Sequence, residues 1–265
     1  MGYWDERDAR AREALSKKSE KKIQKQLIKY YGAAAKQVIE DFENTYNKLL
    51  ATTAKGMEPT PADLYKLDKY WQLQNQLRKE LRKLGEKEVV LLTKEFELNF
   101  FDVYYAWAEV GEPEFSTLDT ESVQKLIAGI WCADGKTFSQ RIWENTEGLI
   151  ETLDAQLIHC VATGKRTTEL KHLLMERFNV SYSRAETLVR TELAHIQVEA
   201  AKKRYEDYGF KKYRILGNTD DTCGNSSPDC AKMDGKEFYF AEMVPGKTAP
   251  PFHPNCKCDI VPVRD

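Results

Sequence analysis

Apolar side chains recur every three or four positions through the first hundred residues, the spacing of one face of an α-helix. This spacing predicts a long helix from about Asp8 to Ala54, a second from Ala62 to Leu84, and helical sequence resuming from Val89 to Phe100. Gly85 is expected to end or kink the second helix, because glycine disfavours helix interiors. A break rich in proline and glycine at 55–61 separates the first two helices, so we expect an antiparallel helical hairpin. The apolar faces of these two helices either pack against each other and the rest of the chain or present a long surface to a partner.

The same periodicity predicts four further helices after the break at 111–113. We expect them near Leu118–Trp131, over Phe138–Gly164, over Thr167–Phe178 and over Ser183–Tyr208. The last of these helices is expected to begin at a capping box, in which Ser183 is followed three places later by a glutamate. Gly209 is placed to end it as the C′ residue.

The pattern changes after Gly209, where small and polar residues become dense. Phe210, Tyr213 and Ile215 predict a strand, and Asp234-Gly235 is typical of a hairpin turn. Cys258 to Val263 is a candidate closing strand, which Pro262 would confine to the edge of a sheet.

These elements predict a mainly α protein with a small C-terminal α+β module. Residues 1–110 are expected to form the long helical hairpin, a candidate surface for a partner protein. Residues 111–164 would supply linker and core helices, and 165–265 would form the α+β module with an irregular tail.

The balance of charge gives no overall case for nucleic-acid binding. Lys and Arg number 40 and Asp and Glu number 42, for a net charge of −2. The distribution is uneven, because the start of the chain is basic, 95–154 is acidic, and 165–214 is mixed with a basic excess. The asymmetry either complements a partner's charge pattern or reflects solvated helix faces.

No apolar run is long enough to cross a bilayer, and the first residues lack the order of a signal peptide. We therefore expect no membrane partner and folding in a reducing cytoplasm, where clustered cysteines favour a metal over disulfides. Cys132 and Cys160 stand alone in helical sequence and are expected to be core residues.

The tail concentrates five potential soft ligands in a stretch with few apolar residues. They are Cys223, Cys230, His253, Cys256 and Cys258. A structural zinc ion held by four of them would supply folding free energy that this segment otherwise lacks. Two disulfides, or thiols that are only partly used, are the alternatives. A catalytic metal is not expected, because a nuclease of the His-Asn-His type needs a second histidine and none follows His253.

Several motifs in fixed order carry a resemblance to a known family. They are Arg190-Thr191-Glu192, Tyr208-Gly209-Phe210, Thr219-Asp220-Asp221-Thr222-Cys223, Cys230-Ala231-Lys232-Met233-Asp234-Gly235-Lys236 and Pro251-Phe252-His253-Pro254-Asn255-Cys256-Lys257-Cys258. In this combination the chain, from about Phe138 to Val263, resembles the Mu F-like minor head proteins of tailed bacteriophages, also called head morphogenesis proteins.

The resemblance implies a structural virion component rather than an enzyme, made in the host cytoplasm and located in the head near the portal vertex. Its implied partner is the portal protein, with scaffold or major capsid protein as further partners and assembly or DNA delivery as its role. A virion protein that binds DNA through the basic first helix is the alternative, followed by a metal-dependent hydrolase.

One position departs from the family pattern, and one motif allows two interpretations. The family often has Cys-x-x-Cys before the Asp-Gly turn, whereas six residues separate Cys223 from Cys230 here, so Cys230 is the matched position. Arg190 and Glu192 lie among apolar helical neighbours. We expect them to pair with groups of the tail and hold it to the helix, rather than to act in catalysis.

Overall fold

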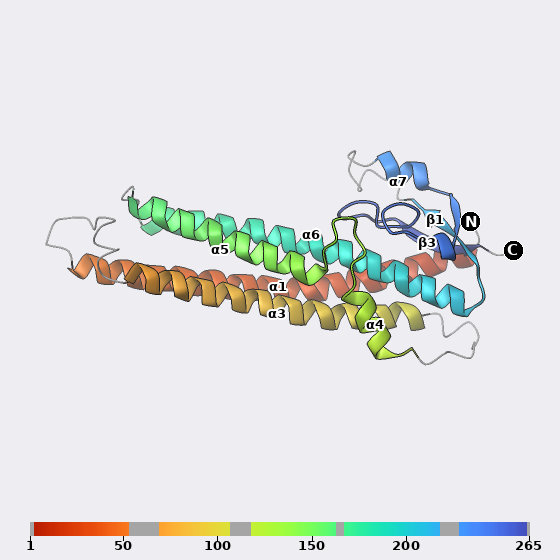
Figure 1. Ribbon diagram of the computed structural model, residues 1–265, viewed down its shortest axis with the longest axis horizontal. Coiled ribbons are helices and arrows are strands. Elements are labelled where there is room, and N and C mark those ends of the chain that lie inside the picture. Colours follow the sequence, from red (N-terminus) through yellow and green to blue (C-terminus); the bar gives the residue numbers. More distant parts are fainter. Residues whose placement is uncertain (1–2, 53–68, 107–117, 163–166, 218–227, 264–265) are drawn as a thin grey trace. The chain divides into compact units, whose positions relative to one another are not determined.

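The computed structural model describes residues 3–52, 69–106, 118–162, 167–217 and 228–263 (Figure 1). The helices are α1 (Tyr3–Thr52), α3 (Lys69–Tyr105), α4 (Thr120–Ile127), α5 (Phe138–Ala162), α6 (Thr167–Asp207) and α7 (Pro228–Met233). The strands are β1 (Lys212–Leu216), β2 (Glu237–Tyr239) and β3 (Asp259–Val263), and a short 3₁₀ helix, η3 (Phe240–Glu242), follows β2. A mainly helical chain with a small C-terminal sheet confirms the predicted fold class.

The chain divides into two compact units. The first, the sheet unit, consists of residues 1–24, 90–141 and 186–265. The second, the bundle unit, consists of residues 25–89 and 142–185. Among the described residues, no helix is apolar over a stretch long enough to span a membrane.

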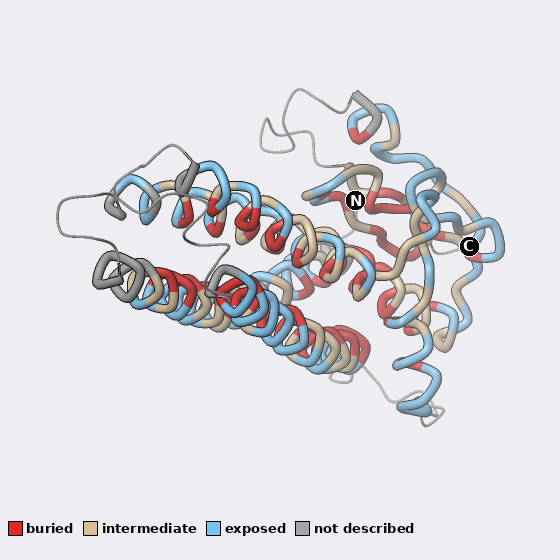
Figure 2. Tube along the Cα trace, turned by 60° about the vertical axis from the view of Figure 1, so that its left-hand side comes forward, coloured by how far each residue is buried: buried red, intermediate tan, exposed pale blue. Residues whose placement is uncertain are grey.

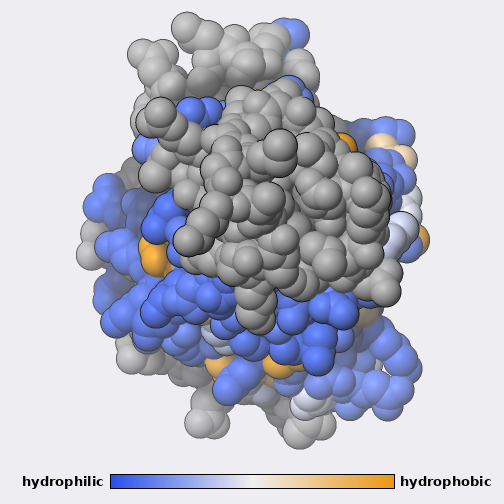
Figure 3. Space-filling view, turned by 90° about the vertical axis from the view of Figure 1, so that its left-hand side faces the viewer, coloured by the Kyte–Doolittle hydropathy of each residue, from blue (hydrophilic) through white to orange (hydrophobic). Residues whose placement is uncertain are grey.

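In the bundle unit, segments of α1, α3, α5 and α6 bury their apolar stripes against one another. The buried positions recur along each helix (Figure 2), and Leu27, Leu77, Leu81, Leu153 and Leu174 are among the most completely buried. The described residues on the face drawn in Figure 3 are mostly hydrophilic, with only scattered hydrophobic ones. This is the division of polar and apolar residues that the three-to-four-residue spacing predicts.

A polar cluster interrupts the apolar core of the bundle unit. The Tyr31 hydroxyl of α1 donates to Glu88 Oε2 of α3 at 3.1 Å and accepts from Asn145 Nδ2 of α5 at 3.2 Å. Asn145 also donates to the Ser181 carbonyl of α6 at 3.0 Å. One side chain or carbonyl from each of the four helices therefore meets here, which fixes the register of the helices.

Gly85 neither ends nor kinks a helix, because α3 runs through it without a break. A Cβ atom at this position would lie 2.9 Å from Thr146 Oγ1 and 3.1 Å from the Trp143 ring, both on α5. The glycine therefore permits a close approach of two helices, and the packing gained there offsets its low helix propensity, about 1 kcal/mol relative to alanine.

The predicted capping box at Ser183 is also wrong, since α6 is one continuous helix from Thr167 to Asp207. Buried apolar residues continue through this stretch, with Phe178 before it and Ala185 and Val189 after it. Tertiary packing supplies most of a helix's stability, so it overrides a local preference of one serine to start a helix.

The end of α6 is the one that the sequence predicts. Gly209 has a φ of 82°, and its N–H donates to the Glu206 carbonyl at 2.9 Å. The Phe210 N–H donates to the Tyr205 carbonyl at 3.0 Å, which completes a Schellman motif. The chain is thereby turned into β1.

The three strands form an antiparallel sheet in the order β2-β1-β3. Pro262 lies on an edge strand, as predicted. The Asp234-Gly235 turn does not join two strands, however. It joins α7 to β2, and Gly235, with a φ of 74°, donates its N–H to the Ile215 carbonyl of β1. A turn dipeptide determines local conformation but not which element precedes it.

The sheet packs on the C-terminal half of α6 through a small aromatic core. Val198, Ala201 and Tyr205 of α6 lie against Tyr213, Ile215, Phe240 and Ile260 of the sheet region. Tyr213 and Phe240 stack at 5.1 Å between ring centroids. This core places the loop between η3 and β3 beside α6.

The start of α1 joins the sheet unit through buried charges. Arg204 of α6 donates to both carboxylate oxygens of Asp8 at 2.8 Å, and the Tyr205 hydroxyl also donates to Asp8. Arg12 donates to Asp259 Oδ1 at 2.7 Å and to the Ile260 carbonyl at 2.6 Å, both on β3. Two buried guanidinium groups, the buried Asp8 and the partly exposed Asp259 thus form one network.

Candidate metal centre

The motif Phe252-His253-Pro254-Asn255-Cys256 forms a tight turn. The Cys256 N–H donates to the His253 carbonyl at 3.1 Å, and Asn255 has a φ of 59°. Asparagine tolerates this left-handed conformation better than most residues. The turn reverses the chain within four residues and brings the His253 and Cys256 side chains together.

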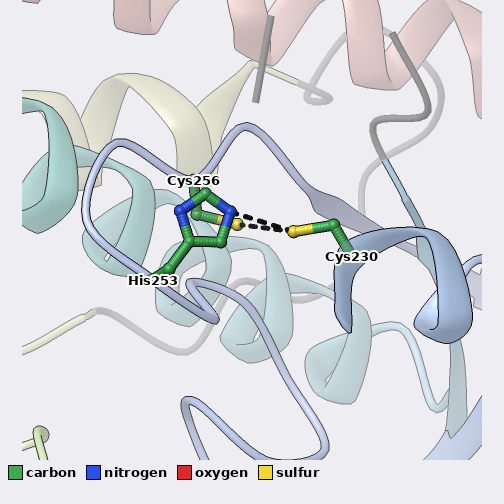
Figure 4. Close-up of side chains that lie close together, drawn as sticks. All are labelled: Cys230, His253 and Cys256. Atoms are coloured by element: carbon green, nitrogen blue, oxygen red, sulfur yellow. Dashed lines mark hydrogen bonds between the residues drawn. The ribbon is translucent and has the colours of Figure 1, made fainter. Parts of the chain in front are cut away.

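The third residue of the cluster, Cys230, comes from α7. Its Sγ lies 3.0 Å from His253 Nε2 and 3.9 Å from Cys256 Sγ (Figure 4). All three ligand atoms lie within 4.8 Å of one another, so the cluster could hold a metal ion. The two sulfurs are too far apart for a disulfide, in which they would be about 2.05 Å apart.

The geometry fits a tetrahedral ion with thiolate and imidazole ligands. Bond lengths of about 2.3 Å for Zn–S imply about 3.8 Å between two sulfur ligands. The distance between Cys230 Sγ and Cys256 Sγ, 3.9 Å, is close to that value. The sulfur–nitrogen distance of 3.0 Å is shorter than the roughly 3.5 Å that the same geometry implies, so a bound ion would move the ring outward slightly.

His253 is held in the tautomer that a metal needs. Its Nδ1 lies 2.7 Å from the Pro254 carbonyl oxygen, which only accepts, so Nδ1 carries the proton. The lone pair of Nε2 then faces the sulfurs. Donation of the distal N–H to a backbone carbonyl is the usual support of a ligating histidine.

The surroundings of Cys256 favour its thiolate form. A hydrogen bond from the Cys258 side chain is the largest cause that lowers its pKa, to about 5. Burial opposes this change, while backbone N–H groups of Phe252 and Cys258 and the nearby His253 support it. A thiolate is the form of cysteine that binds metal.

The five predicted ligands have different outcomes. Cys230, His253 and Cys256 are brought together. Cys258 is buried in the same cluster, yet its sulfur is not one of the three that lie mutually within 4.8 Å. Cys223 lies outside the described residues.

The tail is joined to α6 by Thr191, which sequence reasoning passed over. The Asn255 N–H donates to Thr191 Oγ1 at 3.1 Å, and Thr191 Oγ1 donates to the Thr187 carbonyl at 2.7 Å. The signal was present, because Thr191 is the middle residue of the Arg190-Thr191-Glu192 motif.

The prediction that Glu192 pairs with the tail is wrong, and the structure gives Arg190 a partner on α1. Arg190 donates to Glu20 of α1 at 2.6 Å. Glu192 accepts from Trp131 Nε1 at 2.8 Å, in the segment between α4 and α5, and from Arg141 Nη1 at 3.1 Å, in the first turn of α5. Helical geometry explains this, since three consecutive residues point in directions about 100° apart and contact different neighbours.

Burial around Glu192 perturbs two titratable groups. It raises the pKa of Glu192 to about 7, against the hydrogen bond from Trp131 and the charge of Arg141, which lower it. His195 stacks on Trp131 at 4.3 Å between ring centroids, and burial lowers its pKa to about 3. His195 is therefore neutral and packs as an aromatic residue.

Residues 151–261 match the family described as Phage Mu protein F like protein. The match covers the α6 motif, most of the sheet and the candidate metal cluster, and it confirms the resemblance that the motifs predicted. No curated protein and no solved structure shows a significant match. Over these residues the chain is similar to that family.

Proposed function

We propose that the protein is a minor structural component of the head of a tailed bacteriophage that associates with the portal and acts in assembly or DNA delivery. The family match over residues 151–261 is the observation that carries this proposal. The polar residues of the matched motifs support a structural role. Thr191, Glu192 and Arg190 each hold a different segment on α6.

Co-assembly with the portal protein of the same phage tests the proposal. We expect the full chain to co-purify with assembled portal rings, and to be incorporated into heads when scaffold and major capsid protein are present. Incorporation into heads that lack a portal, at the level seen in normal heads, would contradict the portal association. Failure to join any head would contradict the structural role.

We further propose that the cluster holds one structural zinc ion. Cys230, His253 and Cys256 supply three ligands, and Cys258, buried beside them, supplies the fourth. A site closed by four protein ligands and rich in thiolate is typical of structural rather than catalytic zinc. The ion would cross-link α7 to the turn before β3, where few apolar residues hold the chain.

Metal content of protein purified without oxidant tests the zinc site. We expect one zinc per chain, lost in Cys230→Ser and retained in the control Cys132→Ser. Comparison of Cys258→Ser with Cys223→Ser identifies the fourth ligand, because only the ligand's loss should weaken binding. Protein that contains no zinc and whose thiols all react at once would refute the site.

A nucleic-acid contact through the start of α1 is the second candidate. Lys18 and Lys21 are exposed on this helix. Lys17 and Lys22 instead pair with Glu13 at 2.5 Å and with Glu95 at 2.8 Å, which reduces the available positive charge. Binding to duplex DNA that weakens steeply with salt, and that is lost in Lys18→Gln/Lys21→Gln, would support this candidate.

A further inference from the structure

We infer that the metal centre and the buried anchorage of the N-terminal helix are coupled, so that metal binding helps to keep the start of α1 docked in the sheet unit. This inference rests on the proposed zinc site. It concerns residues 3–24 of α1, β3, and the part of α6 that lies in the same unit.

The first link runs from the metal cluster to α6. Asn255 lies between the ligands His253 and Cys256, and its N–H donates to Thr191 Oγ1. The direction of this N–H depends on the left-handed conformation of Asn255, with a φ of 59°. An ion that fixes the residues on both sides would therefore also fix the donor that reaches α6.

The second link runs from the cluster into β3. Cys258 is directly followed by Asp259, the first residue of the strand. Asp259 Oδ1 accepts from Arg12 Nη1 at 2.7 Å, and the next carbonyl, that of Ile260, accepts from Arg12 Nη2 at 2.6 Å. Both acceptors of the Arg12 guanidinium thus lie within two residues of the cluster.

The charge balance of the network makes these acceptors important. Arg12 is completely buried, and its second carboxylate, Asp8, also binds Arg204 through both oxygens. If β3 shifts and Asp259 leaves, one carboxylate remains for two buried guanidinium groups. A buried charge without a partner is strongly unfavourable, so Arg12 would move out to water and take the start of α1 with it.

A backbone hydrogen bond of α1 also depends on this docking. Gln197 of α6 donates to the Arg12 carbonyl at 2.7 Å, and this bond requires the helix to be docked. Because coupling between two equilibria is reciprocal, a change that weakens the Arg12 anchorage must also weaken metal binding by the same factor.

Hydrogen exchange of the full chain, zinc-loaded and then stripped with a chelator, tests whether bound zinc keeps the start of α1 docked. We expect exchange of residues 3–24 and of β3 to rise at least tenfold without zinc, while residues 25–45 of the same helix and α5 change little. Unchanged exchange over 3–24 after zinc loss would overturn the coupling. An equal rise in all helices would also overturn it, since that is global unfolding.

Zinc affinity measured by chelator competition tests whether the contacts of the sheet unit in turn strengthen zinc binding. A matched pair of variants is used. Thr191→Val removes the acceptor of the Asn255 N–H together with a bond to the carbonyl four residues earlier. Thr152→Val removes the same kind of bond, to Gly148 at 2.7 Å, in the bundle unit. We expect Thr191→Val to weaken zinc binding about fivefold, as one net hydrogen bond implies, and Thr152→Val to have no effect.

A second pair keeps the test valid if one variant folds poorly. Arg12→Lys retains the charge but cannot reach both acceptors, and Arg82→Lys changes an exposed arginine of the bundle unit. We expect weaker zinc binding only in Arg12→Lys. If the unmodified protein binds no zinc, the proposed zinc site is wrong. If it binds zinc and both pairs are indistinguishable, the site stands and the coupling is wrong.

Discussion

The bundle unit and the sheet unit bury polar side chains in different ways. In the bundle unit, the Tyr31 cluster contains a single carboxylate, that of Glu88, surrounded by hydroxyl and amide groups. In the sheet unit, Arg12 and Arg204 share Asp8 and Asp259, and all four groups must be present for the charges to balance. The bundle therefore places a cluster with one carboxylate in its apolar core, whereas the sheet unit adds to its aromatic core a charge-balanced network that joins α1, α6 and β3.

This difference determines how each unit should respond to single changes. Many leucines along four helices share the stability of the bundle, and neighbouring side chains can partly fill a cavity. The hydrogen bonds that join α1 to β3, and the turn at His253–Cys256 to α6, connect segments far apart in sequence. Arg12 and Asp259, for example, are 247 residues apart. The following predictions, from the largest expected effect to the smallest, test this comparison.

Arg204→Met should give the largest loss of stability. It leaves the buried Asp8 carboxylate without its bidentate partner, and breaking a buried pair in this way typically costs about 3–5 kcal/mol. Equilibrium urea unfolding followed by circular dichroism measures the change. The control is Arg82→Met, whose pair with Glu147 is exposed and should contribute less than about 1 kcal/mol. Equal losses in the two variants would contradict the importance assigned to the buried network.

Leu81→Ala should cost about 3 kcal/mol in the bundle unit. Leu81 is completely buried on α3, and its truncation leaves a cavity as well as losing buried apolar surface. Leu98→Ala on the same helix is the control, because Leu98 is 42% exposed. The same urea experiment should show a clearly smaller decrease in the free energy of unfolding for the control. A decrease as large as that of Leu81→Ala would show that the burial of the leucine does not determine the loss of stability.

Glu88→Gln should make the bundle unit less sensitive to pH. Burial raises the pKa of Glu88 from 4.5 to about 7, so the folded state holds a proton that the unfolded state releases between these values. The associated stability is present below pH 4.5 and is lost as the pH rises through 7. Between pH 5 and pH 8, the wild type should lose about 2 kcal/mol more than the variant. Parallel stability curves for the two proteins would contradict this, and Glu147→Gln, at an exposed site of the same unit, is the matched control.

Glu192→Ala should have the smallest and most local effect, about 1–2 kcal/mol from the loss of two buried hydrogen bonds. Hydrogen exchange should increase in residues 131–141, which Glu192 holds, and not in the tail around Asn255. Glu176→Ala, at an exposed position of α6, is the control. Faster exchange in the tail would instead indicate that Glu192 stabilises the tail, as the sequence suggested.

The sequence predicted the helices well wherever the apolar spacing was long and regular. α1, α5 and the end of α6 at Gly209 follow from side-chain spacing and from the conformational freedom of one glycine. The errors at Gly85 and Ser183 share a cause. Both residues favour a helix end locally, and both lie where packing against other helices continues. Local preferences of about 1 kcal/mol cannot outweigh such packing.

The candidate metal centre was predicted in part. His253 and Cys256 are close in sequence, so their joint position follows from one turn. Cys230 lies far from them in sequence, and its meeting with them depends on where α7 lies beside the turn. The partners of Arg190, Thr191 and Glu192 could not be read from the sequence. Each partner belongs to a distant segment, and only the direction of each side chain on α6 selects it.

The sequence by itself therefore determined the helical character of this protein, the edge position of β3, the cysteine- and histidine-rich turn and the similarity of residues 151–261 to the Mu F-like family. These depend on periodicity and on residues close together in the chain. The tertiary structure alone decided that Thr191 holds the turn and that Arg12 joins the start of the chain to β3, one residue beyond Cys258. Such contacts form only when distant segments are buried together, because burial requires each charge and each backbone donor to find a partner.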